Sequence, residues 1–201
     1  ESGLINQLAL NGVMTVNSAG NAGDLTAAGS APARALTVAS SVDAYNALDG
    51  LIVTAPNNLQ GTVGGQTSVA YPWVTAPDVS GSVAMPLSAA NADGCQPLTG
   101  DDAAAVVGKV AWLEWDDNDA TRRCGSASRS ANVRAAGAIG ALFTTSLAEF
   151  ASGITGDPII PVFQLSLDAT NKLRPAAMAG TLKVTFTGSA LTSIPVRDPA
   201  A

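Results

Sequence analysis

Apolar positions near the N-terminus recur at the spacing of a helix. They are Leu4, Ile5, Leu8 and Leu10. Asn11-Gly12 then interrupts the pattern with residue types that accept the left-handed conformation after a helix. Short apolar runs at 13–16 and 35–39 predict two strands, separated by a loop rich in Asn, Ser and Gly. Helix, strand, loop and strand make only half of an α/β sheet unit, so we predict that residues 1–45 are a fragment of a domain.

The pattern changes between residues 43 and 93. Short runs of Val, Ile, Leu and Thr are broken there by Gly, Pro and Asn, which predicts several short strands joined by turns. The glycine-rich segment 61–65 is followed neither by a Lys-Ser/Thr pair nor by an obvious helix, so it does not fit a phosphate-binding loop. We interpret this segment as a hairpin turn in an all-β region.

Helical and strand patterns alternate after residue 98. Thr99-Gly100-Asp101-Asp102 can cap a short helix over residues 103–107, and a second helix is predicted over 126–136. Gly108 and Gly137 follow these segments and would end the helices. Further strands are predicted at 109–113, 139–143, 159–165 and 181–186, with a polar loop at 116–123. The fold class is therefore mixed α/β, a β-rich module with a few short helices.

Composition limits the classes of protein that fit this pattern. Of 201 residues, 47% are hydrophobic and only 13% are charged, which is typical of a folded chain rather than a disordered one. Sixteen acids and ten bases give a net charge of -6 and a pI near 4.4, which opposes binding to nucleic acid or to anionic lipid. The longest uncharged run, 50–77, contains prolines, glycines and amide side chains that a membrane helix would not tolerate together. We therefore predict no nucleic-acid partner and no membrane span.

Histidine is absent from the sequence. A Ser-His-Asp or Cys-His relay therefore cannot form within this chain, and neither can a metal site with histidine ligands. The chain starts with Glu1-Ser2-Gly3, without an initiator Met or a basic-then-apolar leader, so we interpret it as a piece excised from a longer protein. A catalytic role would depend on residues outside this chain.

The two cysteines are Cys95 and Cys124, and neither has a CxxC or histidine companion. Two ligands are too few for a zinc site, so a disulfide is the favoured interpretation. A disulfide would imply an oxidising compartment. The alternative is a pair of buried free thiols in a cytosolic protein.

Two further groups of residues, an acidic run and a pair of tryptophans, each have both a functional and a structural interpretation. The acidic run 116–119 could offer oxygens to calcium, but it lacks the glycine and the terminal glutamate of an EF-hand loop, so we favour a solvated loop. Trp112 and Trp115 could form a binding face, but core packing of one of them is the simpler interpretation. We predict no metal and no cofactor in this chain, and we leave calcium open for the intact protein.

One loop offers a candidate catalytic group. Residues 18–23 follow a predicted strand, and glycines bracket the single amide side chain of Asn21. An amide held in this way could donate a hydrogen bond to the oxyanion of an acyl-transfer reaction. The residues alone leave an ordinary loop as the alternative.

The order of residues around this loop resembles a known family. The central stretch of the subtilisin-like serine peptidases is similar, in order and spacing, to Gly12-Val13-Met14-Thr15-Val16, Ser18-Ala19-Gly20-Asn21-Ala22-Gly23, Ala31-Pro32-Ala33 and Ala35-Leu36-Thr37-Val38-Ala39-Ser40. The resemblance implies that Asn21 is the oxyanion-hole asparagine and that the strand 35–39 belongs to the parallel sheet of that family. The triad motifs Asp-Ser/Thr-Gly, His-Gly-Thr-His and Gly-Thr-Ser-Met-Ala do not occur in this chain.

A second resemblance covers more of the chain. The protease-associated (PA) domain is similar to the series Cys95, Gly108-Lys109-Val110-Ala111-Trp112-Leu113, Cys124, Ala135-Ala136-Gly137-Ala138-Ile139-Gly140-Ala141-Leu142 and Ile160-Pro161-Val162-Phe163. Many secreted subtilases carry this α/β module between the oxyanion-hole asparagine and the catalytic serine, which is the order found here. Where the family often has Arg-Gly, this sequence has Glu114-Trp115, so a partner contact at that position is not carried over.

The two resemblances together imply an organisation and a function. Residues 1–45 would be a fragment of a subtilisin-like catalytic domain, 46–190 a PA domain with its lead-in strands, and 191–201 a return segment. The chain would be the PA-domain part of a secreted subtilisin-like serine endopeptidase. It would not be catalytic by itself, and it would contact the rest of the peptidase domain and polypeptide substrates or protein partners, in substrate access, positioning or assembly.

Two other functions compete with this one. A self-standing extracellular PA-type interaction module would have no peptidase role, although such a module would not need the N-terminal forty residues. An extracellular carbohydrate binder is suggested only by Trp73, Trp112 and Trp115 and by the weakly charged composition.

Overall fold

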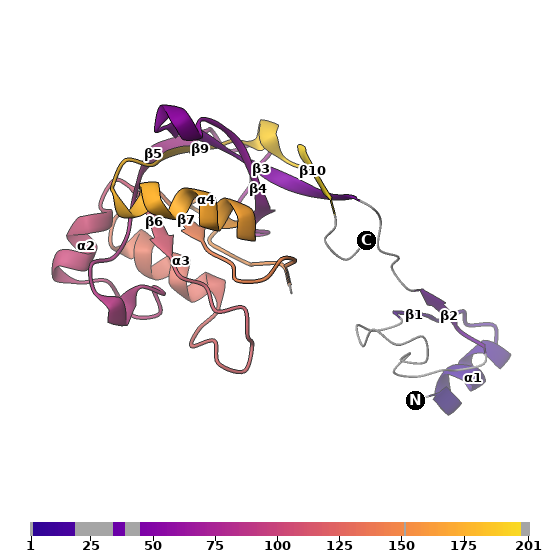
Figure 1. Cartoon of the computed structure of the whole chain (residues 1–201). Coiled ribbons are helices and arrows are strands. Elements are labelled where there is room, and N and C mark those ends of the chain that lie inside the picture. Colours follow the sequence, from indigo (N-terminus) through magenta and orange to yellow (C-terminus); the bar gives the residue numbers. More distant parts are fainter. Residues whose placement is uncertain (1, 19–33, 39–44, 151, 198–201) are drawn as a thin grey trace. The chain divides into compact units, whose positions relative to one another are not determined.

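The computed structural model describes residues 2–18, 34–38, 45–150 and 152–197 (Figure 1). The chain divides into an N-terminal unit, Glu1–Ala44 with Ala200–Ala201, and a larger unit, Tyr45–Pro199. The larger unit holds all the buried hydrophobic residues found among the described part of the chain.

The N-terminal unit contains a helix and two paired strands. Helix α1 (Ser2–Leu10) ends as predicted, because Gly12 has a φ of 80° and the amide groups of Gly12 and Val13 donate to the carbonyl groups of Ala9 and Leu8. These bonds tie Val13 to the helix end, so the strand predicted at 13–16 begins only at its last residue. The strands β1 (Val16–Ser18) and β2 (Leu36–Val38) pair in parallel.

Seven strands of the larger unit close into a ring among the described residues. In spatial order they are β3 (Tyr45–Ala55), β4 (Gly61–Thr67), β8 (Val162–Leu165), β7 (Gly140–Phe143), β6 (Val110–Leu113), β5 (Val79–Ala84) and β9 (Lys183–Phe186), which pairs back onto β3. The neighbours from β5 through β6 and β7 to β8 are parallel, and the other pairs are antiparallel. This mixed α/β, barrel-like sheet confirms the predicted fold class.

Helices form two of the three connections between parallel neighbours, and the connection from β7 to β8 contains no helix. Helix α2 (Gly100–Val106) lies between β5 and β6, α3 (Ser126–Ala135) lies between β6 and β7, and α4 (Leu167–Met178) leads from β8 to β9. Short 3-10 turns occur at η1 (Asn57–Leu59), η2 (Ala89–Asn91) and η3 (Gly188–Ala190). Within the described ranges, no helix is long and apolar enough to cross a membrane.

Alternate residues of the parallel strands enter two hydrophobic clusters. On β6, Val110 and Trp112 pack into the cluster that includes residues of α4, whereas Ala111 and Leu113 pack into the cluster that includes Val133 of α3. Because both faces are covered, the central strands β6, β7 and β8 are buried along their whole length. This is why β6 and β7 carry no polar side chain at any position, while β8 has only Gln164 among apolar residues.

Both glycine stops predicted for α2 and α3 are confirmed, but the predicted cap of α2 is only partly right. Gly108 and Gly137 have φ values of 68° and 88°. Thr99 is the N-cap of α2, yet its side chain makes no capping hydrogen bond. The carboxylate of Asp102 instead accepts hydrogen bonds from the backbone amide and hydroxyl of Ser88, which tie the helix to the segment before it.

The interpretation of residues 61–65 as a hairpin turn is wrong, because they lie inside strand β4. Gly64 and Gly65 are needed there for close packing rather than for a turn. A Cβ atom on Gly65 would overlap the ring of Phe163 and the backbone carbonyl of Gln164 on the neighbouring strand β8. Both glycines therefore let large side chains of other strands approach the backbone.

Replacing Gly65 by Ala is expected to lower the free energy of unfolding by about 1–3 kcal/mol or more, because backbone atoms of β8 must move. The measurement is a urea unfolding curve of the variant. Gly153→Ala is the matched control, since no atom lies within 4 Å of a Cβ built at that position. Equal midpoints for the two variants would show that this contact between β4 and β8 does not constrain the ring.

Two elements were not predicted from the sequence. Helix α4 begins at the N-cap Ser166, whose hydroxyl accepts from the amide of Ala169. The helical spacing of its apolar residues is interrupted by Pro175, a residue that usually ends a helix. Strand β10 (Ile194–Arg197) lies in the segment that was interpreted only as a return segment. It pairs antiparallel with the first four residues of β3, so that Arg197 is opposite Tyr45. The larger unit thus begins and ends on paired strands.

Candidate functional site

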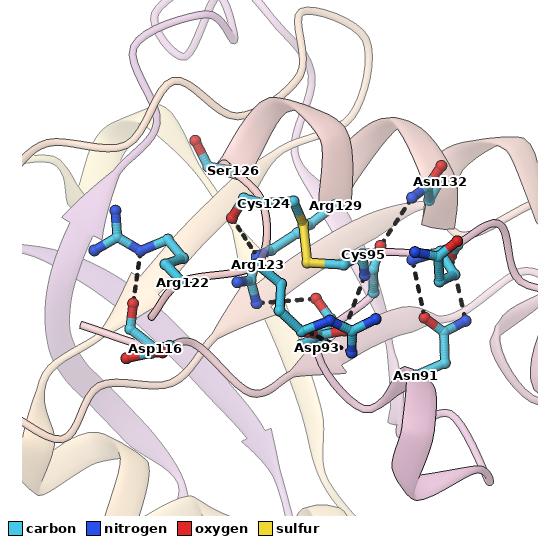
Figure 2. The surroundings of a disulfide bond; sticks show 12 residues. Asn91, Asp93, Cys95, Asp116, Arg122, Arg123, Cys124, Ser126, Arg129 and Asn132 are labelled. Atoms are coloured by element: carbon cyan, nitrogen blue, oxygen red, sulfur yellow. Dashed lines mark hydrogen bonds and ion pairs between the residues drawn. A yellow bond between two sulfur atoms is a disulfide. The ribbon is translucent and has the colours of Figure 1, made fainter. Parts of the chain in front are cut away.

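The predicted disulfide between Cys95 and Cys124 is present (Figure 2). It joins the segment that precedes α2 to the loop that precedes α3. Asn132 of α3 binds the same first segment, because its side-chain amide donates to the carbonyl group of Gly94 over 2.9 Å. Asn21, the candidate oxyanion-hole residue, lies outside the described residues.

A buried arginine lies behind the disulfide. Arg129 has no exposed surface, and its guanidinium donates to the carbonyl groups of Cys124 (3.2 Å) and Asp93 (3.0 Å) (Figure 2). It also donates to the carbonyl group of Glu114 (2.7 Å). Burial lowers the pKa of this guanidinium. The second terminal nitrogen has no hydrogen-bond partner, but the guanidinium lies 4.7 Å from the centre of the Trp115 ring. Arg129 therefore cross-links three segments through their backbones.

None of the three tryptophans offers an open ring for sugar binding. Trp112 belongs to the core, and Trp73 is also buried. Trp115 follows the end of β6 and stacks on Phe143, with ring centres 5.3 Å apart. The guanidinium of Arg122 lies 4.4 Å from the centre of the same ring. The simple core interpretation therefore holds for Trp112, and nothing here favours the carbohydrate binder.

The acidic run 116–119 is organised by hydrogen bonds within the protein. The carboxylate of Asp116 accepts from the Thr121 hydroxyl (2.7 Å) and from the Asn118 amide (2.9 Å), and these bonds, Thr121 first, hold the pKa of Asp116 below its usual range. Arg122 donates to the carbonyl group of Asp116 over 2.6 Å and forms an ion pair with Asp119. The run therefore lies in a loop, as predicted, and its carboxylates are held by hydrogen bonds from within the protein.

Asp117 holds this acidic loop against the segment after β7. One carboxylate oxygen accepts from the amide (2.6 Å) and hydroxyl (2.8 Å) of Ser146 and from the hydroxyl of Thr145 (3.0 Å). The other oxygen accepts a longer bond from the side chain of Gln164. In the part of the chain that the structure describes, no group of three His, Cys, Asp or Glu residues is placed to hold a metal ion.

Glu114, at the position where the PA family often has Arg, is bound within the module. Both of its carboxylate oxygens accept from Arg174 of α4, and Trp112 and Thr144 donate to the same carboxylate. Burial alone would raise the pKa of Glu114, but these donors, Arg174 first, lower it below its usual value, and Glu114 raises the pKa of Arg174. The pair joins the end of β6 to α4.

A further ion pair gives a pH-dependent contribution to stability. Asp157 is only 3% exposed and accepts from Arg134 (2.9 Å) and from the amides of Ile159 (2.8 Å) and Ile160 (3.2 Å). Burial would raise the pKa of Asp157, but these hydrogen bonds outweigh it and lower the pKa. Its contribution is therefore complete above the unfolded-state pKa of about 3.9 and is lost as the pH falls through the lower pKa of the folded state.

Asp157→Asn is expected to lower the free energy of unfolding by about 1–3 kcal/mol at pH 7, since an amide cannot accept from all three donors. The difference from the wild type should shrink as the pH falls below about 4, because the wild-type carboxyl becomes protonated first in the unfolded chain and then, at lower pH, in the folded protein. Urea unfolding between pH 7 and pH 2 measures both. Asp119→Asn, which changes an 82% exposed carboxylate paired with Arg122, is the control and should change stability by less than about 0.5 kcal/mol. A pH-independent difference would contradict this role of Asp157.

Two neighbouring segments, residues 68–76 and 146–154, contain almost no charged side chains, and we call them the uncharged face. Residues 68–76 contain no charged side chain and residues 146–154 contain only Glu149. Amides of Val69 and Ala70 donate to the carbonyl groups of Ile154 and Thr155, which holds the segments side by side. Val69 and Val74 are 79% and 86% exposed, and Leu147 is 42% exposed. Large apolar side chains that are exposed on segments with so little charge are a common feature of protein contact surfaces.

Comparisons with known proteins complete the description. The family model described as the PA domain matches residues 74–173. No curated protein sequence gives a significant match. Similar solved structures include an aminopeptidase from Aneurinibacillus sp. strain AM-1, with 15% identity, a TM-score of 0.48, and coverage of 71% of this chain and 31% of that chain.

Two further similar structures are a zinc aminopeptidase and a protease. BSAP from Bacillus subtilis is 13% identical, with a TM-score of 0.45, and the similarity covers 69% of this chain and 30% of that chain. The psychrophilic subtilisin-like protease Apa1 from Pseudoalteromonas sp. AS-11 is 14% identical, with a TM-score of 0.47 and coverage of 92% and 50%. The chain thus spans about a third of the aminopeptidases and half of the protease.

Proposed function

Since the chain contains a PA domain, matched over residues 74–173, we propose that it is the PA-domain part of a secreted subtilisin-like serine peptidase. In this proposal the larger unit is inserted in the catalytic domain and acts by contacting proteins, while the catalytic Ser, His and Asp come from outside this chain. Asn21 would be the oxyanion-hole donor, a role that rests on the resemblance of residues 12–40 to the subtilase family.

The pairing of the two ends of the larger unit carries this proposal. Tyr45 and Arg197 are opposite each other in the register of β3 and β10, so the chain enters and leaves the unit at neighbouring backbone positions. A domain with adjacent ends can be inserted into a surface connection of another domain without disturbing it.

The N-terminal unit gives independent support. Its two strands pair in parallel, and parallel sheets are stable only when further strands and helices cover them. Among the described residues of this unit, seven large apolar side chains are exposed, namely Leu4, Leu8, Leu10, Val13, Met14, Val16 and Leu36. These features are expected for a fragment whose remaining sheet and core come from the same catalytic domain.

The uncharged face is the candidate contact surface for polypeptide substrates or protein partners. Its exposed valines, Val69 and Val74, lie in the loop that follows β4, outside the helices and strands that form the core.

We also propose secretion, because a disulfide between half-buried cysteines persists in oxidising compartments. The alternative of a self-standing extracellular module is favoured only by the closure of the ring, which buries a core without outside help.

The test is to remove the module from the intact parent protein. Residues 46–196 would be replaced by a two-residue turn, which can join the paired positions Tyr45 and Arg197. Hydrolysis of a short peptide is expected to persist, while the rate or the pattern of cleavage of a folded protein substrate changes. Loss of short-peptide hydrolysis with an unfolded catalytic domain would contradict an insertion at this point, and unchanged cleavage of both substrates would contradict the contact role.

A further inference from the structure

The two strands that carry the chain into and out of the larger unit form a short ribbon. It consists of residues 45–48 of β3 and 194–197 of β10, and we call it the connecting ribbon. It has four residue pairs, and Pro195 in it lacks an amide hydrogen. A two-stranded ribbon of this size is marginal by itself, so its direction relative to the ring depends on contacts at their junction.

Asp49 lies at this junction. It is the first residue of β3 after the connecting ribbon, and it is opposite Gly65 of β4 in the ring. One carboxylate oxygen accepts from the amide (2.9 Å) and hydroxyl (2.6 Å) of Thr67 at the end of β4. The other accepts from the amide of Thr192 (2.8 Å), with the Thr192 hydroxyl at 3.5 Å, just before β10 begins.

The turn that Asp49 binds has an unfavourable backbone conformation. Thr192 has a φ of 49°, in the left-handed region that a β-branched residue rarely adopts. Such a residue persists only where its surroundings hold it, and here the Asp49 carboxylate binds its amide. The next residue, Ser193, donates to the carbonyl group of Ala190 over 2.6 Å.

Gly50 brings the same turn against β3. A Cβ atom at this buried position would lie 2.5 Å from the Ser193 hydroxyl oxygen and 2.9 Å from the Ala190 carbonyl oxygen. The turn therefore packs directly on the backbone of β3, beside the residue whose carboxylate binds it. Packing and hydrogen bonds thus converge on one joint.

We propose that the Asp49 carboxylate locks the joint between the connecting ribbon and the ring, so that the module is held as a rigid arm. Only a side chain with two acceptor oxygens can bind both strands here, because the backbone amides of Thr67 and Thr192 donate to different oxygens of Asp49. Unlike hydroxyl hydrogens, these amide hydrogens cannot rotate away from the side chain. An asparagine in either orientation satisfies one of these amides and turns its own NH2 group towards the other. The consequence that this lock sets the direction of the PA domain in a parent peptidase rests on the proposed function.

The test is amide hydrogen exchange, followed by NMR, on the full 201-residue chain. In Asp49→Asn, exchange of the amides of the connecting ribbon is expected to rise about tenfold or more, while amides of β6 and β7 exchange as in the wild type. Asp101→Asn, the same change of charge at an exposed position in the first turn of α2, should leave both sets unchanged.

The variant Thr192→Gly distinguishes the effect of the Asp49 hydrogen bond from the effect of the strained backbone at residue 192. Glycine keeps the amide that donates to Asp49 and accepts a positive φ without strain, so the connecting ribbon should stay as protected as in the wild type. Unchanged exchange of the ribbon in Asp49→Asn would overturn the proposal, and so would an equal rise in ribbon and ring or a loss of protection in Thr192→Gly. Because exchange is measured on this chain alone, these results do not depend on the peptidase assignment.

Discussion

Reduction of the Cys95–Cys124 disulfide is expected to lower the free energy of unfolding by about 3–4 kcal/mol. The bond closes a loop between positions separated by 29 residues, and in the chain-entropy model opening such a loop restores this amount of freedom to the unfolded chain. Arg129 and Asn132 also bind the segment that carries Cys95, so the folded state keeps these contacts after reduction. The loss should therefore appear as lower stability rather than as a different fold.

Urea unfolding followed by tryptophan fluorescence measures this effect. The midpoint of the wild type should fall on addition of a reductant, and Cys95→Ser/Cys124→Ser should have a similarly low midpoint in its absence. The double variant is also the control, because a reductant should not change its midpoint. A wild type whose stability is the same with and without reductant would contradict the role given to this disulfide.

Replacing Asn21 by Ala in the intact parent protein is expected to reduce kcat for peptide hydrolysis by about 10²–10³-fold. This figure is borrowed from subtilisin, where the loss of one oxyanion-hole donor has an effect of that size. The reason is that a fixed amide hydrogen bond strengthens as negative charge develops on the carbonyl oxygen in the transition state. KM should change little, because the donor matters mainly in that state.

The matched control is Asn58→Ala, which removes an exposed amide from η1 in the larger unit and should leave kcat unchanged. Circular dichroism of both variants establishes that each is folded. If Asn21→Ala hydrolyses peptides as fast as the wild type, the assignment of this residue to an oxyanion hole is wrong, whatever the role of the PA domain.

The central strands and three of the four helices, α1, α2 and α3, could be predicted because local signals coincide with the structure there. Strands β6 and β7 are buried on both faces and are continuously apolar, so the sequence pattern marks them directly. Gly108 and Gly137 end α2 and α3 with positive φ, as the positions of these glycines suggested. In these places the same residue satisfies local geometry and packing.

Elements were missed or misread where long-range packing decides the structure. Segment 61–65 has the composition of a turn, and only the approach of Phe163 and the β8 backbone explains glycines within a strand. Pro175 in α4 is an ordinary helix-breaking signal, yet it lies on the exposed side of a helix whose residues Leu173, Ala176 and Ala177 are buried. Tertiary burial outweighs local preference in both cases.

The side-chain hydrogen bonds that join distant segments could not be predicted from the sequence, although Arg129 is a partial exception. Asp117 and Glu114 are bound by residues that lie far away in the chain, Ser146 and Arg174, and nothing local indicates these pairs. Arg129 could have been noticed, because Ser126, Arg129, Ser130 and Val133 recur at the spacing of a buried helical face. A charged residue on such a face predicts a buried polar cross-link.

The most direct test of the central claim is to sequence the parent reading frame on both sides of Glu1 and Ala201. The account predicts an Asp-Ser/Thr-Gly and a His-Gly-Thr-His motif upstream and a Gly-Thr-Ser-Met-Ala motif downstream, which would supply the triad that this chain lacks. Flanking sequence without these motifs would contradict the peptidase assignment and leave the PA domain as an interaction module on its own.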